Sequence, residues 1–146
     1  MRLVFKQLCK ENLDQVYALE RTCFATPWSK EQFEICLANQ HVYFWGVFLG
    51  RELVAYLSLF CAGKEAEIWN IAVLPEYRQK GIGSYLLAKG LHFLQQKKIK
   101  KVFLEVRAGN IAAQRLYFKF HFQQVGCRRH YYPDTKEDAW ILAKCL

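Results

Sequence analysis

The chain has 146 residues, of which 53% are hydrophobic and 16% aromatic, enough for a packed core; this composition excludes an intrinsically disordered chain. It contains no run of 18 or more apolar residues, and its first residues, MRLVFKQLCKENLDQ, are charged where a signal peptide needs an unbroken apolar segment. We therefore expect one domain over residues 1–146, soluble and cytoplasmic, without a membrane partner. The net charge of +8 favours anionic partners without naming one.

Apolar periodicity predicts a short strand at 3–8 and then a helix within 11–24. Ser29 is a candidate N-cap, and Gln32 completes a capping box that opens a second helix. The strands HVYFWGVFLG and RELVAYLSLFC follow, and Gly50 between them favours a hairpin turn.

The second half of the chain begins with a strand, AEIWNIAVL. The helix after it carries one apolar stripe, formed by Ile82, Leu86, Leu87, Leu91 and Leu94. A strand KKVFLEVRA, a helix GNIAAQRLYFKF and the closing strands FQQVGCRRHYY and EDAWILAKCL complete the chain. The order β-α-α-β-β-β-α-β-α-β-β is not a regular βα alternation, so we expect an α/β (α+β) fold with a mixed sheet instead of a doubly wound one.

The cysteines are scattered and form no CxxC pair, and no histidine stands near them at the spacing of metal ligands. We therefore expect free, buried thiols and no metal site. A catalytic cysteine would need a lowered thiol pKa, which we do not expect at these positions. The cysteines are Cys9, Cys23, Cys36, Cys61, Cys127 and Cys145.

The densest basic cluster is KKIKK, Lys97–Lys101, at the predicted carboxyl end of a helix, where cations complement the helix dipole. A solvated helix end is the simpler interpretation. Weak electrostatic contact with ribosomal RNA is the alternative, although the cluster has no interleaved aromatic residues in the sequence.

The segment YRQKGIGS, residues 77–84, lies between a predicted strand and a predicted helix and contains the pattern R-x-x-G-x-G. Gly81 and Gly83 lack Cβ atoms, so backbone N–H groups there can approach a bulky anion, and the helix amino end favours phosphate. Arg78 and Lys80 add charge nearby. Without further context, a glycine pair before a helix is equally well explained as a simple turn.

Context comes from FLEVRAGN, in which Glu105 lies near the end of a strand and Asn110 at the start of the next helix. Tyr117 follows nearly two helical turns later, so it can share a face with Asn110 at roughly 10 Å along the axis. We expect the three side chains to converge near one cleft, where they suit proton removal and proton return. The alternatives are a Glu105 paired with Arg107 or Arg115 and a Tyr117 that only packs in the core.

These features together resemble the GNAT N-acetyltransferase superfamily and, within it, the RimI family of ribosomal-protein-alanine N-acetyltransferases. The glycine turn alone would indicate only the superfamily. The combination of PWS, LEVRxxN and RRxYYP is more specific. The matching segments are TPWS at 26–29, NIAVLPEYRQKGIG at 70–83, LEVRAGNIAAQRLY at 104–117, RRHYYP at 128–133 and EDAWIL at 137–142.

The resemblance implies a GNAT fold with a central sheet of about seven strands, mostly antiparallel, and a splayed parallel pair in the middle, flanked by about four helices. It implies acetyl-CoA as the co-substrate, Glu105 as general base and Tyr117 as general acid. It also implies that Trp28, Tyr131 and Tyr132 line the peptide site. The implied acetyl-CoA contacts are Ile71, Ala72, Val73, Gln79, Lys80, Gly81, Ile82, Gly83, Ser84 and Asn110.

His121 departs from the family pattern, and Glu67 competes with Glu105 for the role of general base. Relatives commonly read LYxxxGF where this chain reads LYFKFHF, so His121 replaces a glycine that would end the helix in a left-handed conformation. Glu67 is a competing general base, because strand alternation puts it on the face of Trp69 and Ile71 near the same cleft.

Three hypotheses for function remain at this point. The first is an N-terminal alanine acetyltransferase, monomeric, acting on a ribosomal protein and not on DNA. The second is a GNAT enzyme for another amine, a lysine side chain or a small molecule. The third is a catalytically silent acyl-CoA-binding or RNA-binding module, which the presence of both Glu105 and Tyr117 disfavours.

Overall fold

The computed structural model describes residues 2–146, which form seven strands, four α-helices and two short 3-10 helices. The predicted order of strands and helices is confirmed. The elements are β1 (Val4–Gln7), η1 (Lys10–Asn12), α1 (Leu13–Cys23), α2 (Lys30–Leu37), β2 (Val42–Leu49), β3 (Glu52–Ala62), β4 (Glu65–Val73), η2 (Pro75–Tyr77), α3 (Ile82–Gln96), β5 (Lys101–Arg107), α4 (Ile111–Lys119), β6 (Gln123–Arg128) and β7 (Ala139–Cys145).

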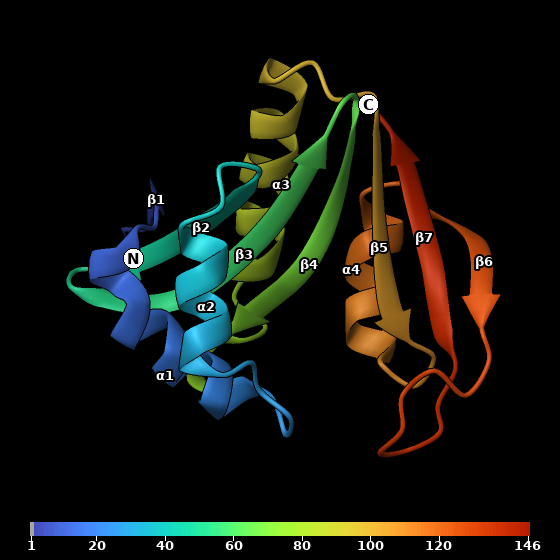
Figure 1. Ribbon diagram of the computed structural model, residues 1–146, viewed down its shortest axis with the longest axis horizontal. Coiled ribbons are helices and arrows are strands. Elements are labelled where there is room, and N and C mark those ends of the chain that lie inside the picture. Colours follow the sequence, from blue (N-terminus) through green and yellow to red (C-terminus); the bar gives the residue numbers. More distant parts are fainter. Residues whose placement is uncertain (1) are drawn as a thin grey trace.

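All seven strands form one sheet in the order β1-β2-β3-β4-β5-β7-β6. Every neighbouring pair is antiparallel except β4 and β5, which are parallel. The predicted mixed sheet with a parallel pair in its middle is therefore confirmed (Figure 1).

The parallel pair separates part-way along its length. Residues Glu65–Ile68 of β4 pair with Lys101–Leu104 of β5, and beyond these residues the two strands have no register with each other. Figure 1 shows the two ribbons close together where they begin and apart where they end. The edge of β4 that faced β5 is consequently free of strand pairing from Trp69 onward.

The helices cover both faces of this sheet and bury two apolar clusters. Helices α1 and α2 pack on one face, where Val16, Leu19 and Phe33 contribute to the smaller cluster. Helices α3 and α4 lie on the other face, and the predicted apolar stripe of α3 is fully buried there. Strands β2–β4 therefore lie between two helical layers, whereas the cluster under α1 and α2 includes no residue of β5 (Figure 1).

Two local predictions are confirmed by hydrogen bonds or backbone geometry. The Gln32 N–H donates to Ser29 Oγ (3.1 Å), and the Ser29 N–H donates to Gln32 Oε1 (2.8 Å), which is the expected capping box of α2. Strands β2 and β3 form a hairpin in which Leu49 pairs with Glu52 and Gly50 has a φ of 60°.

The cysteine prediction is correct only in part. All six thiols are free, but Cys61 alone is buried, while Cys9, Cys127 and Cys145 are exposed. The exposed thiols lie at the edges of the structure, before η1, on the outer strand β6 and at the end of β7, where little covers them. The expectation of buried thiols was therefore wrong for these three residues.

Helix α4 ends in a Schellman motif at His121, which has a φ of 69°. The Phe122 N–H donates to the Tyr117 carbonyl (3.1 Å) and the His121 N–H to the Phe118 carbonyl (3.0 Å), the two bonds that define the motif. The rings of Tyr117 and Phe122 are in contact, with centroids 5.6 Å apart. This turn therefore helps to fix the position of Tyr117.

Replacing His121 with glycine is expected to stabilise the protein by about 0.5–1 kcal/mol, because glycine adopts the left-handed conformation without a Cβ clash. The free energy of unfolding in denaturant measures the effect. Arg115→Gly, at an exposed and right-handed position of the same helix, is the matched control and is expected to destabilise by about 1 kcal/mol. A loss of stability in His121→Gly would contradict this account of the helix end.

Candidate active site

A cleft of about 740 Å³ lies on the α1 and α2 face of the sheet, where β4 and β5 diverge. One wall comes from α2 and the loop before it, and the other from β6 and the loop that leads to β7. Its lining residues are Trp28, Gln32, Ile35, Cys36, Glu67, Ile68, Trp69, Asn70, Phe103, Leu104, Glu105, Arg128, Tyr131, Tyr132 and Ile141. The cleft thus brings together the two candidate bases and the aromatic residues predicted to line the peptide site: Glu105, Glu67, Trp28, Tyr131 and Tyr132.

Glu105 stands on β5 opposite Ile141 of β7, with its side chain 34% exposed. Its Oε1 is 3.3 Å from Arg128 Nε, so the ion pair is with Arg128 and not with Arg107 or Arg115. Arg107 instead forms two hydrogen bonds with Asp134. Within residues 2–146, Oε2 of Glu105 has no hydrogen-bond or ion-pair partner, so it is available to accept a proton.

Glu67 lines the same cleft, and its Oε2 accepts a hydrogen bond from Trp69 Nε1 (3.0 Å). The prediction that Ile71 shares this face was wrong. A β-bulge between the pairs Ser58–Asn70 and Leu59–Ile68 leaves Trp69 as an extra residue, so alternation shifts by one after it. Ile71 packs with the α3 side of the core, and Asn70 takes its place beside the cleft.

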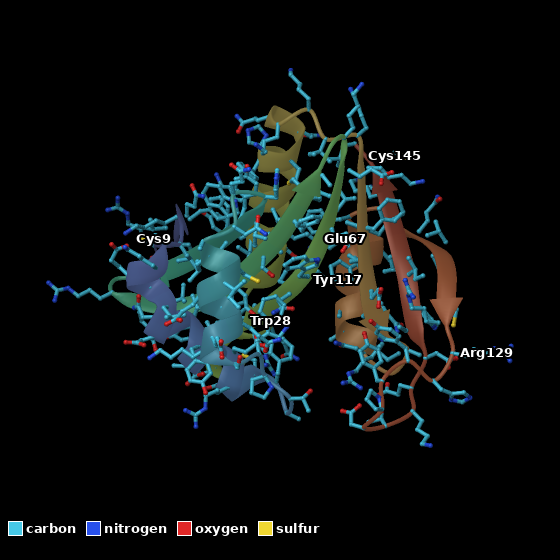
Figure 2. The ribbon with its side chains drawn as sticks, in the orientation of Figure 1. Cys9, Trp28, Glu67, Tyr117, Arg129 and Cys145 are labelled. Carbon is cyan, nitrogen blue, oxygen red and sulfur yellow. The ribbon has the colours of Figure 1, made fainter. Side chains whose placement is uncertain are left out.

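Tyr117 lies on the opposite face of the sheet, in α4, and is 4% exposed. Neither Tyr117 nor Asn110 lines the cleft, so the expected convergence of three side chains in one cleft was wrong. Strand alternation explains the difference, because Leu104 and Val106 face the core on the α4 side while Glu105 faces the other way. Figure 2 shows Tyr117 between the ribbons of β4 and β5, two strands that pair only over Glu65–Ile68 and Lys101–Leu104.

The Tyr117 hydroxyl is not shut inside the core. It has no hydrogen-bond partner in residues 2–146. In that range, Trp45 Nε1 is the only fully buried side-chain polar atom that lacks a partner, so the unpaired Tyr117 hydroxyl is not fully buried. The small exposed part of Tyr117 therefore includes its hydroxyl. Burial, and to a lesser degree the neighbouring Tyr132, raises the pKa of Tyr117 above its usual value, so the hydroxyl keeps its proton near neutral pH.

The glycine turn leaves the amino end of α3 open. Gly81 is the N-cap residue with a φ of 80°. No side chain among residues 2–146 caps the helix, so its first N–H groups have no partner within that range. Gln79 also has a positive φ (60°). Arg78 has a local role, because its Nε donates to the Val73 carbonyl (2.9 Å). A Cβ at Gly83 would lie 3.6 Å from Leu116, which is ordinary van der Waals contact.

Other residues predicted to contact acetyl-CoA surround this turn. Ile71, Ala72 and Val73 form the part of β4 that no longer pairs with β5. Ser84 accepts a hydrogen bond from Lys119 of α4 (3.2 Å). Asn110 is the N-cap of α4, and its Oδ1 accepts from the Ala113 N–H (3.2 Å), which is a capping role visible without any ligand.

The loop between β6 and β7 is held by Arg107. Its guanidinium stacks on the Tyr132 ring at 3.9 Å and bonds Asp134 at 2.9 and 3.2 Å. Tyr131 and Tyr132 contact each other edge to face. Arg129 of the predicted RRHYYP segment points outward, away from the cleft (Figure 2).

The sequence did not predict three residues at the cleft. Arg128, the partner of Glu105, and Asn70 line it, and the buried carboxylate of Glu20 supports its wall at Trp28. For Glu20 a signal existed, because it follows Val16 at the i+4 spacing and so occupies the apolar stripe of α1. For Asn70 no signal existed, because its face depends on the bulge.

Comparison with known proteins identifies the family. The profile of the acetyltransferase (GNAT) family matches residues 13–122, which is most of the chain. The chain belongs to the GNAT acetyltransferase family. This GNAT protein is thus an acyltransferase by family, as the glycine turn and the parted strands indicated.

Relatives within the GNAT family narrow the assignment to the RimI group. The chain is 35% identical over 133 residues to a putative ribosomal protein bS18-alanine N-acetyltransferase of Bacillus subtilis, covering 90% of this chain and 88% of the relative. It is 37% identical over 122 residues to N-alpha-acetyltransferase RimI of Mycobacterium tuberculosis, covering 81% and 75% of the two chains. The crystal structure of the ribosomal-protein-S18-alanine N-acetyltransferase from Escherichia coli superposes with a TM-score of 0.93 at 30% identity, covering 99% of this chain and 94% of that one.

Other features of this GNAT protein concern partners. No helix within residues 2–146 is long and apolar enough to cross a membrane. The cluster Lys97–Lys101 follows α3 as expected, and Lys97 Nζ lies 4.8 Å from the centre of the Tyr43 ring, so an aromatic neighbour is supplied by β2. Contact of this cluster with ribosomal RNA stays a prediction.

Proposed function

We propose that this GNAT protein transfers the acetyl group of acetyl-CoA to the N-terminal α-amine of an alanine in a ribosomal small-subunit protein. The observation that carries the proposal is the parting of β4 from β5 after Ile68 and Leu104, with a free Glu105 oxygen on one face of the sheet and Tyr117 on the other. The activity for which the RimI relatives are named supports the choice of acceptor.

The residues around the unpaired part of β4 and the start of α3 fit acetyl-CoA. The uncapped amino end of α3 after Gly81 offers backbone N–H donors and a partial positive charge to a pyrophosphate. The unpaired edge of β4 at 71–73 offers backbone groups to an extended arm. Bound there, acetyl-CoA supplies a thioester whose carbonyl carbon accepts an amine and whose sulfur leaves as thiolate. Residues 79–84 and Asn110 would hold it from the α3 and α4 side.

The chemistry of the acceptor favours an α-amine. An α-amine has a pKa of about 7.7–8.0 and a lysine side chain about 10.4, so the neutral nucleophile costs about 3.4 kcal/mol less to form from the α-amine. A base of ordinary strength is then sufficient. The carboxylate of Glu105, acting directly or through water, meets that requirement in an open and partly exposed cleft.

The two proton-transfer roles fall on opposite faces of the sheet. Glu105 takes the proton from the amine on the cleft side through its unpaired Oε2. Tyr117 returns a proton to the leaving thiolate on the α4 side, and its raised pKa keeps that proton available until the thiolate forms. A single carboxylate and a single phenol thus avoid competing for one proton, because the sheet separates them.

The walls of the cleft suit a peptide. Trp28 packs on Trp69 with ring centroids 5.9 Å apart, and Tyr131 is 48% exposed on the opposite wall. We assign Trp28, Tyr131 and Tyr132 to the binding of the first residues of the acceptor protein, since aromatic side chains supply contact area at low entropic cost.

A two-peptide assay tests the proposal. With acetyl-CoA present, a peptide with a free N-terminal alanine is expected to gain one acetyl group by mass spectrometry. The same peptide, blocked at its N-terminus and containing one lysine, is expected to stay unmodified. Acetylation of only the blocked peptide would overturn the proposed acceptor in favour of a lysine, and modification of neither would indicate a silent acyl-CoA-binding module or a different amine.

A further inference from the structure

Glu20 is a carboxylate buried in α1 and bound without any cation. It is 2% exposed, and no salt bridge reaches it within residues 2–146. Its Oε1 accepts from the Tyr56 hydroxyl (2.5 Å), and its Oε2 accepts from the backbone N–H of Trp28 (2.9 Å). A buried carboxylate needs such donors, because removal from water without them is very costly. One side chain therefore holds the Trp28 wall and the Tyr56 hydroxyl together.

The direction of these hydrogen bonds fixes the orientation of the next hydrogen-bonded side chain, that of Asn70. A carboxylate only accepts, so the single hydroxyl proton of Tyr56 is directed to Glu20. The Tyr56 oxygen can then only accept, and it does so from Asn70 Nδ2 (2.7 Å). Burial, with the nearby charge of Glu20, raises the pKa of Tyr56, so this proton is retained. The amide of Asn70 is thereby held with its nitrogen toward Tyr56 and its Oδ1 away from it.

The Asn70 Oδ1 is left free beside the cleft. Asn70 lines the cleft, and its backbone N–H is fixed separately by Ser58 Oγ (3.0 Å). Its Oδ1 has no protein partner and is not among the enclosed polar atoms of residues 2–146. The residue lies two positions beyond Ile68, where β4 parts from β5, and it shares the cleft with Glu105.

We propose that Asn70 binds the acceptor amine through Oδ1, and that Glu20 and Tyr56 are positioning residues that prevent its amide from flipping. A carbonyl oxygen fixed in this orientation selects an N–H donor and rejects a group without one. The inference rests on the proposed function only in requiring that the acceptor amine enters this cleft. It adds a recognition group that is separate from the general base.

A thermodynamic cycle tests the role of Asn70. Calorimetry with coenzyme A present compares a short peptide with a free N-terminal alanine against its des-amino analogue, in which the amine is replaced by hydrogen. Asn70→Ala is expected to weaken binding of the amino peptide about 10- to 100-fold and to leave the des-amino peptide within about twofold, because one charge-assisted hydrogen bond is lost. Equal weakening of both peptides would overturn the inference.

Steady-state kinetics separate positioning from structure. Asn70→Ala and Tyr56→Phe are both expected to raise KM for the peptide, by about tenfold and about threefold, with KM for acetyl-CoA unchanged. Ser58→Ala is the matched control, since it removes the bond to the Asn70 backbone and leaves the orientation of the amide intact. A rise with Ser58→Ala as large as with Asn70→Ala would show that strand geometry, not Oδ1, is responsible. Should Tyr56→Phe fail to fold, Asn70→Ala and Ser58→Ala still decide the question.

The two proposals fail in distinguishable ways. If the wild-type protein acetylates the alanine peptide and Asn70→Ala leaves the cycle unchanged, the inference is wrong and the proposed function stands. If it acetylates only the lysine peptide, the proposed acceptor is wrong, and the same cycle is run with that peptide and its norleucine analogue.

Discussion

Replacing Glu105 with Gln is expected to lower kcat by about 10²- to 10⁴-fold, the range over which a positioned general base contributes. The amide has the same shape but cannot accept the proton of the amine. KM for acetyl-CoA is expected to change little, because Glu105 lies on the cleft face and the donor-side turn lies at the start of α3. Initial rates with the alanine peptide at saturating acetyl-CoA measure the effect.

The pH profile distinguishes base catalysis from a structural effect. In the Glu105→Gln variant the rate is expected to rise as the pH approaches the pKa of the α-amine, about 7.7–8.0. More of the amine has then lost its proton to solvent and is neutral. Arg128→Ala is the control for the ion pair, since it removes the partner at 3.3 Å and keeps the carboxylate. It is expected to retain most activity. Full activity in Glu105→Gln together with loss in Glu67→Gln would transfer the role to Glu67.

Replacing Tyr117 with Phe is expected to lower kcat by about 10²-fold or more while binding of coenzyme A is mostly retained. The ring would still pack against Phe122, so the Schellman turn and the core remain intact. Only the hydroxyl, which has no hydrogen-bond partner within residues 2–146, is lost. Turnover and the dissociation constant of coenzyme A, measured separately, test the two halves of this expectation.

The raised pKa of Tyr117 adds a condition on the pH dependence. Because burial favours the neutral phenol, Tyr117 stays protonated at every pH at which the α-amine becomes neutral. The wild-type rate is therefore expected to show no alkaline fall caused by Tyr117 below about pH 10, its ordinary pKa. Tyr85→Phe, which removes a hydroxyl from the neighbouring helix α3, is the control and is expected to keep normal turnover. Unchanged turnover in Tyr117→Phe would exclude it from the mechanism.

Much of the fold follows from local patterns that survive in the structure. The apolar stripe of α3, the capping box at Ser29 and Gln32 and the glycine turn each depend on residues a few positions apart. Such signals fix the type and order of elements, which were predicted correctly. The order of elements indicated a mixed sheet, and the family resemblance added its parallel pair, which periodicity alone does not specify.

The arrangement of the site was less predictable, for reasons of geometry. One extra residue at Trp69 reverses the faces of all later residues in β4, and a strict period of two cannot anticipate it. The contact of Glu20 with Tyr56 joins residues 36 positions apart, so it depends on how α1 lies on the sheet. Likewise, the separation of Glu105 from Tyr117 by the sheet follows only once α4 is placed on its face.

The short ladder between β4 and β5 also has a mechanical meaning. Strands β1–β4 and β5–β7 are two half-sheets, and in the part of the chain that the structure describes they pair only over Glu65–Ile68 and Lys101–Leu104, at one end. The two half-sheets are therefore joined at one end of the β4–β5 pair and separate at the other. A molecule bound at the open end would contact both half-sheets at once, and its binding would link them where the backbone does not.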